Sequence, residues 1–189
     1  MRVIAGKAKG TRLGSVPGSG TRPTLDRVKE ALFNILQTRI SGADFLDLFA
    51  GNGGIGIEAL SRGARQAVLV DCSPACIRMI RQNLSAAELD GAQVLAMPVH
   101  RAVEKLSRAG IQFDIIFLDP PYGQGLVEKT LIQLSRTALL RQGGVVVAEH
   151  GVKEEINLST SKFERNRQEK YGDTVLGFFT LREDEHDCE

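Results

Sequence analysis

The sequence of 189 residues has no long apolar run and few cysteines. The longest stretches without Asp, Glu, Lys or Arg are ten residues, at 48–57 and 91–100. A membrane-spanning helix needs about 20 mostly apolar residues, so we expect no membrane segment. Three cysteines, an odd number, do not make a disulfide framework, which indicates the reducing cytoplasm. The remaining composition, 42% hydrophobic and 25% charged, is typical of one soluble globular domain.

The sequence also has almost no net charge, because 24 basic residues face 23 acidic ones. An even spread of these charges would argue against a nucleic-acid partner. The spread is uneven, however: residues 1–40 carry a net charge of +6, residues 181–189 carry −4, and the middle carries −1. We therefore expect a basic extension over residues 1–40, a nearly neutral domain over 41–182 and a solvated acidic tail over 183–189.

From residue 45 onward, buried strands and helices alternate. Strands are expected at 45–49, 67–70, 94–97, 113–118 and 145–148, and helices at 55–62, 74–87, 103–108 and 126–140. Residues 162–170 and 174–181 flank a Gly-Asp turn and predict an antiparallel hairpin. This order predicts a doubly wound α/β sheet. Ahead of it, residues 1–20 are expected to form a short β-hairpin or arm, followed by a helix that Thr24 or Asp26 caps.

A glycine-rich loop follows the first expected strand. Gly51, Gly53 and Gly56 match the pattern G-x-G-x-x-G, and Asp71 ends the next strand 20 residues after Gly51. Such a loop brings backbone N–H groups close to an anionic ligand, and an acid at the position of Asp71 can accept both ribose hydroxyls of an adenosine. The same glycines could also do no more than make a tight strand–helix turn.

Two classes of cofactor fit this loop, the dinucleotides and S-adenosylmethionine. Asp47 ends the first expected strand, where its charge would repel a pyrophosphate. S-adenosylmethionine carries an ammonium and a sulfonium, which an acid attracts, and its carboxylate suits the N–H groups at the start of a helix. Asp47 therefore favours the methyl donor, although a cap or turn role for it stays open.

A second motif, Asp119-Pro120-Pro121-Tyr122, follows the apolar strand at 113–118. Two successive prolines stiffen the backbone and remove two N–H donors. Acceptors remain, the Asp119 carboxylate and the Pro120 carbonyl, which can hold an exocyclic amine, while Tyr122 offers a flat face to a base. Alternatively, the motif is a strand-ending turn with a capping Asp. Ligands of open α/β sheets bind at the carboxyl ends of strands, where this motif lies.

With these motifs the chain resembles the S-adenosylmethionine-dependent amino-methyltransferases that carry (Asn/Asp/Ser)-Pro-Pro-(Tyr/Phe). Within them it is most similar to the bacterial small-subunit ribosomal RNA guanine-N2 methyltransferases. The resemblance covers about residues 1–182 and rests on RVIAG at 2–6, RPTLDRVKEALFN at 22–34 and DLFAGNGGIGIEALSRGA at 47–64, besides the Pro-Pro motif. It implies a Rossmann-like class I methyltransferase with a seven-stranded, mostly parallel sheet, a reversed C-terminal hairpin and an N-terminal hairpin and helix.

The resemblance also implies a reaction and a set of site residues. The reaction is methylation of a guanine N2 amine in 16S ribosomal RNA, within the small subunit or its assembly intermediate. Asp119 and Pro120 would hold the amine and Tyr122 would stack on the base. The cofactor would contact Asp47, Ala50, Gly51, Asn52, Gly53, Gly54, Gly56, Asp71 and Cys72. His100 stands where the family often has Asp or Asn near the adenine; it either accepts that hydrogen bond or is an ordinary surface His.

The basic extension is expected to grip RNA phosphates. The residues proposed for this are Arg2, Lys7, Lys9, Arg12, Arg22, Thr24 and Arg27. Thr24, Arg27 and Phe33 could line the RNA path or a lid on the cofactor. A solvated charged surface and a mitochondrial transit peptide are the other interpretations; family matches from Arg2 onward would leave no removable leader. We expect a cytoplasmic monomer without a metal site, since the pair Cys72 and Cys76 has no partner pair.

Three other functions stay open. One is methylation of another amine by the same fold, either adenine N6 in DNA or RNA or a protein glutamine. A non-catalytic nucleic-acid-binding module is a more distant possibility. A nucleotide-dependent oxidoreductase is disfavoured by Asp47 and by the Asp119 turn.

Overall fold

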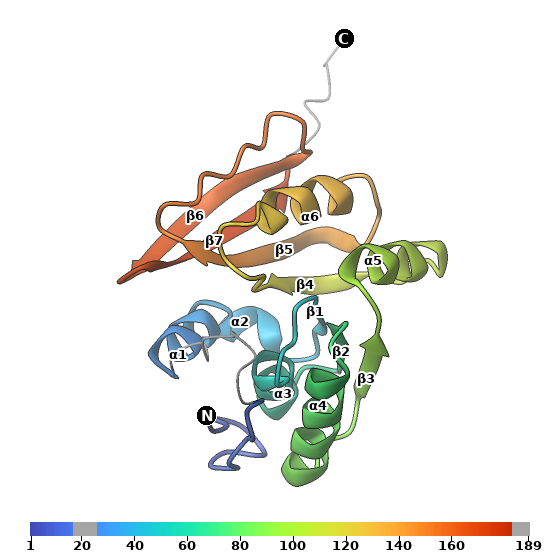
Figure 1. Ribbon diagram of the computed structural model, residues 1–189, viewed down its shortest axis with the longest axis vertical. Helices are drawn as coiled ribbons and strands as arrows, with labels where there is room; N and C mark the ends of the chain where they lie inside the picture. Colours follow the sequence, from blue (N-terminus) through green and yellow to red (C-terminus); the bar gives the residue numbers. More distant parts are fainter. Residues whose placement is uncertain (17–25, 183–189) are drawn as a thin grey trace.

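The computed structural model describes residues 1–16 and 26–182, and within them it contains one seven-stranded sheet in the order β3-β2-β1-β4-β5-β7-β6 (Figure 1). The strands are β1 Asp44–Asp47, β2 Gln66–Asp71, β3 Ala92–Ala96, β4 Phe113–Leu118, β5 Leu140–Gly151, β6 Phe163–Tyr171 and β7 Thr174–Leu181. β1 to β5 pair in parallel, whereas β7 runs antiparallel between β5 and β6. The predicted doubly wound sheet with a reversed C-terminal hairpin is confirmed.

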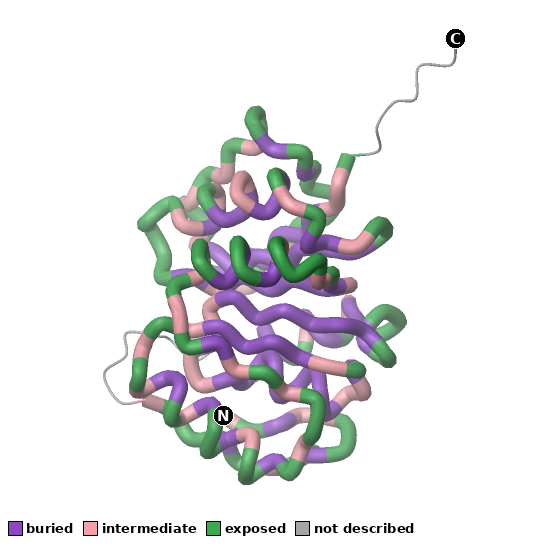
Figure 2. The backbone as a smooth tube through the Cα atoms, turned by 90° about the vertical axis from the view of Figure 1, so that its right-hand side faces the viewer, coloured by how far each residue is buried: buried purple, intermediate pink, exposed green. Residues whose placement is uncertain are grey.

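Helices cover both faces of this sheet. Successive side chains of each buried strand point to opposite faces, so each strand contributes apolar residues to both helix layers. The helices are α1 Asp26–Ile35, α2 Gln37–Ile40, α3 Gly54–Ser61, α4 Pro74–Ala87, α5 Val99–Arg108 and α6 Leu126–Leu134. On β1, Phe45 faces a core with α1 to α4, while Leu46 faces a core with α5 and α6. Figure 2 shows the result, with buried backbone through the central strands and exposed turns around them.

Several boundaries differ from the sequence prediction. α5 begins at Val99 instead of residue 103, and β1 ends at Asp47 instead of residue 49. The largest difference is at α6, whose helix was predicted to reach residue 140. The helix ends at Leu134 because hydroxyl groups take the last carbonyls: Ser135 Oγ donates to Ile132 O at 2.9 Å and Thr137 Oγ1 to Leu134 O at 2.8 Å. β5 then begins at Leu140, earlier than predicted. The pair Gly143-Gly144, expected to be a turn before the strand, lies inside it, where the register against β4 shifts.

The first 16 residues fold back on the domain. One antiparallel bridge joins Arg2 to Arg12, and Val3, Ala8 and Leu13 pack in an apolar cluster with Ile57 of α3. Over residues 1–16, the expected hairpin or arm is thus a short, docked segment. Its expected continuation to residue 20 and the Thr24 cap lie outside the described residues, and α1 begins at Asp26. We call residues 1–16 the N-terminal arm from here on. The domain boundary at residue 40 stays a prediction, and the acidic tail at 183–189 lies outside the described residues.

The described helices include none that is both long and apolar enough to cross a membrane. The predicted start of α4 is confirmed: Ser73 Oγ accepts a hydrogen bond from Cys76 N at 3.4 Å, and Pro74 occupies the first helical turn. The turn between β2 and α4 is therefore short and is closed by a side-chain cap.

Candidate cofactor pocket and catalytic turn

A pocket of about 280 Å³ opens at the carboxyl ends of β1 and β4. β1 and β4 are neighbours in the sheet, and the chain order reverses between them, which is where open α/β sheets bind their ligands. The glycine loop and arm form one part of the lining, with Met1, Ser15, Val16, Asp47, Phe49, Ala50, Gly51, Asn52, Gly54 and Ile55. Cys76, Phe117 and Asp119 complete it. The two motifs singled out in the sequence therefore share one pocket.

The glycine loop is shaped by a few close contacts. Gly51 and Gly53 have φ values of +56° and +82°, which residues with a Cβ rarely adopt. Asp71 Oδ2 accepts from Gly51 N at 2.9 Å, and its Oδ1 accepts from Ser73 N at 2.8 Å. The Asp71 carboxylate thus joins the loop after β1 to the turn after β2, and each oxygen keeps a lone pair for a ribose hydroxyl.

Gly56 has a packing role. A Cβ at this position would lie 2.8 Å from side-chain carbons of Leu69 on β2, so α3 can approach the sheet only with glycine here. Gly56 N also donates to Asp47 Oδ2 at 3.3 Å. At this position the tight strand–helix turn, the alternative interpretation of the motif, accounts for the residue.

Asp47 is a buried carboxylate with no cation beside it among the described residues. It is 1% exposed, and its Oδ1 makes no hydrogen bond in the described part of the chain. Burial raises the pKa of its carboxyl from 3.8 to about 7, with a smaller contribution from the charge of Asp71, while the Gly56 N–H opposes the shift. A ligand cation in the pocket would reverse this penalty, and the ammonium of S-adenosylmethionine is such a group.

The turn at residues 119–122 contributes Asp119 to the same pocket. Asp119 is partly buried, Pro120 is buried and the Tyr122 side chain is 43% exposed. Tyr122 Oη donates to Glu149 Oε1 at 3.0 Å and lies 3.3 Å from Thr174 Oγ1. Burial raises the pKa of the Tyr122 hydroxyl above its usual range, and the charges of Glu149 and Asp119 add to this shift, while the hydrogen bond with Thr174 opposes it. The neutral hydroxyl therefore anchors the turn to the ends of β5 and β7.

Several predicted cofactor residues do not line the pocket. Gly53 and Gly56 pack toward Leu69 of β2 instead of the pocket. Asp71 contacts the loop through its hydrogen bonds with Gly51 and Ser73, and the neighbouring Cys72 is exposed. His100 is exposed in the first turn of α5, where its carbonyl accepts from Gln133 Nε2 at 3.0 Å. The roles of Cys72 and His100 toward an adenine stay predictions.

The structure describes five of the seven residues that were predicted to contact RNA. Arg2, Lys7, Lys9, Arg12 and Arg27 are all exposed, whereas Arg22 and Thr24 lie outside the described residues.

Two other residues of the basic extension, Lys29 and Phe33, are buried. Lys29 is fully buried in an ion pair with Glu58 at 3.1 Å, so it cannot reach RNA. Phe33, proposed to line a lid or an RNA path, is 0% exposed, stacked on Phe45 and covered by Arg62 at 4.9 Å. That proposal for Phe33 was wrong, because its apolar ring belongs to the core.

Sequence reasoning missed several residues of the site. Met1, Ser15 and Val16 line the pocket from the arm, and Asn83 of α4 holds the arm and the loop together. Glu149 is 4% exposed and anchors Tyr122. Its position late in a buried strand was the available signal, the same signal that marked Asp71. In residues 1–16 and 26–182, no group of three or more His, Cys, Asp and Glu is placed to hold a metal.

The sheet order, the pocket between β1 and β4 and the two motifs around it define a class. The chain is a Rossmann-like class I methyltransferase, an enzyme that takes its methyl group from S-adenosylmethionine. It belongs to the family described as Conserved hypothetical protein 95, whose model matches residues 1–180.

Relatives of known name match over nearly their whole length. The candidate rRNA methyltransferase YlbH of Bacillus subtilis (strain 168) is 39% identical over 183 residues, 96% of this chain and 100% of that protein. Ribosomal RNA small subunit methyltransferase D of Escherichia coli (strain K12) is 33% identical over 179 residues, 95% of this chain and 89% of that protein.

Solved structures agree with the fold. A hypothetical protein of Thermus thermophilus superposes with a TM-score of 0.83 at 32% identity, covering 94% of this chain and 98% of that one. A methyltransferase complexed with SAH shares the fold at 16% identity, with a TM-score of 0.69 over 85% of this chain and 50% of that one.

Proposed function

We propose that this enzyme methylates ribosomal RNA of the small subunit, and that the acceptor is the N2 amine of a guanine in 16S rRNA. One observation carries the proposal: Asp119 of the Pro-Pro turn lines the same pocket as Asp47 and the glycine loop. A methyl donor on the loop and an amine on the turn would therefore meet in one space. The names of the full-length relatives support ribosomal RNA as the substrate.

The loop residues would hold the donor through opposite charges. Asp47 would face the ammonium, because it is a buried pocket carboxylate with no cation beside it among the described residues. The N–H groups of the loop and the start of α3 would face the carboxylate of the methionine end. Asp71 would accept the ribose hydroxyls with the lone pairs that Gly51 and Ser73 leave open.

The turn residues would hold the acceptor. Asp119 and the Pro120 carbonyl would accept the two amine hydrogens, which directs the nitrogen lone pair at the methyl group. The nitrogen forms a bond to the methyl carbon while the carbon–sulfur bond breaks and its electron pair stays on sulfur. The ammonium formed on the base then loses its proton to Asp119 or to water. Such positioning supplies on the order of 7–11 kcal/mol of a barrier.

Tyr122 would stack on the target base. Its hydroxyl is tied to Glu149, and a Cβ on Gly151 would lie 3.5 Å from the Tyr122 ring, so this ring packs on the end of β5. With the side chain 43% exposed, the ring retains accessible surface on which a base can stack. A guanine in structured RNA would have to be splayed out of its helix to reach this ring.

RNA would be gripped by the exposed basic residues of the arm and of α1, Arg2, Lys7, Lys9, Arg12 and Arg27. Met1, Ser15 and Val16 of the same arm line the pocket, which supports a path for RNA from the arm to the donor site. The proposal includes a cytoplasmic enzyme that acts as a monomer, which light scattering on the purified protein checks.

Tritiated methyl transfer followed by nucleoside analysis tests the function. The enzyme is incubated with labelled S-adenosylmethionine and with naked 16S RNA, assembled small subunits, DNA or protein. N2-methylguanosine from an RNA substrate is the expected product. N6-methyladenosine or methylglutamine would replace the guanine assignment with one of the other amine acceptors.

The role of Asp119 has its own test. Asp119→Ala is expected to lower kcat by at least about 100-fold, because the amine loses its orientation, while SAH still binds to the loop. Asp119→Asn, which keeps an acceptor oxygen, is the matched control and is expected to retain more activity. Turnover of Asp119→Ala at the wild-type rate would contradict the assignment.

A further inference from the structure

The N-terminal arm forms one wall of the cofactor pocket. Met1, Ser15 and Val16 line it, although they belong to neither of the two motifs. The Met1 side chain lies on the start of α3, since a Cβ on Gly54 would be 2.3 Å from Met1 Sδ. Met1 Sδ also lies 3.8 Å from Asn52 Nδ2. The arm thus touches the same loop residues that would contact a cofactor.

Asn83 of α4 joins the arm to the glycine loop. Its Oδ1 accepts from Gly14 N at 2.7 Å, and its Nδ2 donates to Gly14 O at 3.1 Å and to Asn52 O at 2.8 Å. Asn52 Nδ2 donates to the same Gly14 carbonyl at 2.9 Å. Asn83 is 3% exposed, so its hydrogen bonds are shielded from water. We call Asn83, Gly14 and Asn52 the Asn83 latch.

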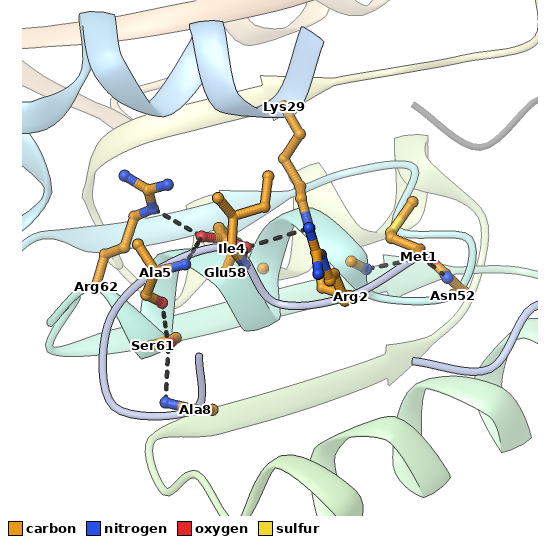
Figure 3. A network of polar contacts seen from close by, with 12 residues as sticks. Met1, Arg2, Ile4, Ala5, Ala8, Lys29, Asn52, Glu58, Ser61 and Arg62 are labelled. Carbon is orange, nitrogen blue, oxygen red and sulfur yellow. Dashed lines mark hydrogen bonds and ion pairs between the residues drawn. The ribbon is translucent and has the colours of Figure 1, made fainter. Parts of the chain in front are cut away.

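A second contact fixes the other end of the arm on α3 (Figure 3). Glu58, fully buried, accepts from Ile4 N at 2.8 Å and from Ala5 N at 3.0 Å. It also pairs with Lys29, whose Nζ donates to Arg2 O at 2.6 Å. Glu58 lies one helical turn after Gly54, the residue at which the cofactor loop becomes α3. The arm is therefore held at two points, by Asn83 and Asn52 at the loop and by Glu58 on α3.

We propose that the N-terminal arm is part of the S-adenosylmethionine site and that Asn83 is the positioning residue that couples the arm to the glycine loop. Docking of the arm and binding of the cofactor then strengthen each other, because coupling between two sites is reciprocal. A cofactor should order the arm, and an undocked arm should weaken the cofactor. The inference concerns only the donor site and holds whatever base accepts the methyl group.

Two variants separate the arm from the rest of the domain. Asn83→Ala removes the latch. Gly6→Ala acts on the far side of the arm: Gly6 has φ +85°, and a Cβ there would lie 1.8 Å from Ser61 O, so the arm cannot dock on α3 as it does here. Ser135→Ala is the matched control, because it removes a buried hydroxyl hydrogen bond at the end of α6, away from arm and pocket.

Calorimetric titration with SAH is the test, on the full chain. Both Asn83→Ala and Gly6→Ala are expected to weaken SAH binding by at least about fivefold, while Ser135→Ala binds like the wild type. Wild-type affinity in a folded Gly6→Ala protein would overturn the proposal, even if Asn83→Ala binds weakly, because the effect would then reside in the loop alone. If Asn83→Ala does not fold, Gly6→Ala decides.

Hydrogen exchange gives an independent readout. SAH is expected to slow the exchange of arm amides such as Val3, Ile4 and Gly14 in the wild type and to have a smaller effect in Gly6→Ala. If the arm were merely structural, the variants would have a lower melting temperature, but SAH would change arm exchange equally in the wild type and in Gly6→Ala. Equal arm exchange with and without saturating SAH in the wild type would also overturn the proposal.

Discussion

Two aspartates of the same short strand have opposite surroundings. Asp44 begins β1 and Asp47 ends it, and each is 1% exposed. Asp44 forms ion pairs with Arg65 and with Arg141, the latter at 3.1 Å. Asp47 has no cation beside it among the described residues, and its pKa is raised to about 7.

The difference separates a structural end of the sheet from a functional one. At the amino end, Arg141 also pairs with Asp114, where burial alone would raise the pKa of the carboxyl, but the hydrogen bonds from Asp44 N and from Arg141 lower it. The charges there are neutralised within the chain. At the carboxyl end, Asp47 is buried with no cation beside it among the described residues, and under the proposed function the cofactor ammonium would supply the positive charge.

The largest expected effect is on stability at the amino end. Asp44→Asn removes the charge that two half-exposed arginines pair with and is expected to lower the free energy of unfolding by about 2–3 kcal/mol, because the buried side chain loses two charge-assisted hydrogen bonds. SAH affinity should not change at temperatures where the variant is folded. Thermal unfolding and calorimetry check both parts; a loss of SAH binding by the folded variant would show that the two ends are not independent.

At the carboxyl end of β1, the substitution of Asp47 is expected to increase stability instead of lowering it. In the folded protein the Asp47 pKa is raised, so folding costs more as the pH rises from about 4 to about 7 and the full cost applies above that. Asp47→Asn should therefore stabilise the ligand-free protein at pH 8, by about 2 kcal/mol, with little gain at pH 4.5. SAH binding should weaken at least tenfold. Lower stability at pH 8 would contradict the account of Asp47.

The smallest expected effect concerns the turn at residues 119–122. Tyr122→Phe keeps the ring and loses the hydrogen bond to Glu149, so kcat should fall by only a few-fold and SAH affinity should stay unchanged. Glu149→Gln, which keeps an acceptor for the hydroxyl, should have a similar or smaller effect on methyl transfer. A loss of activity in Tyr122→Phe as large as in Asp119→Ala would give the hydroxyl a direct role in the reaction.

The sequence predicted what depends on local pattern. The parallel strands, the loop at Gly51 and the turn at Asp119 could be located because each is a short motif after an apolar run. The Asn83 latch and the Glu58 contacts could not, since they join residues 69 and 54 positions apart. Lys29 contributes to the net charge of residues 1–40, and only its ion pair with Glu58 of α3 shows that this charge is buried.

Proton release on binding tests the contrast between Asp44 and Asp47 most directly. At pH 7 about half of the Asp47 carboxyls carry a proton, and a bound ammonium should lower that pKa. Titration with SAH at pH 7 in two buffers of different ionisation enthalpy is expected to show release of about half a proton per site, absent in Asp47→Asn and retained in Asp44→Asn. Binding without proton release, or with proton uptake, would contradict a cofactor cation beside Asp47.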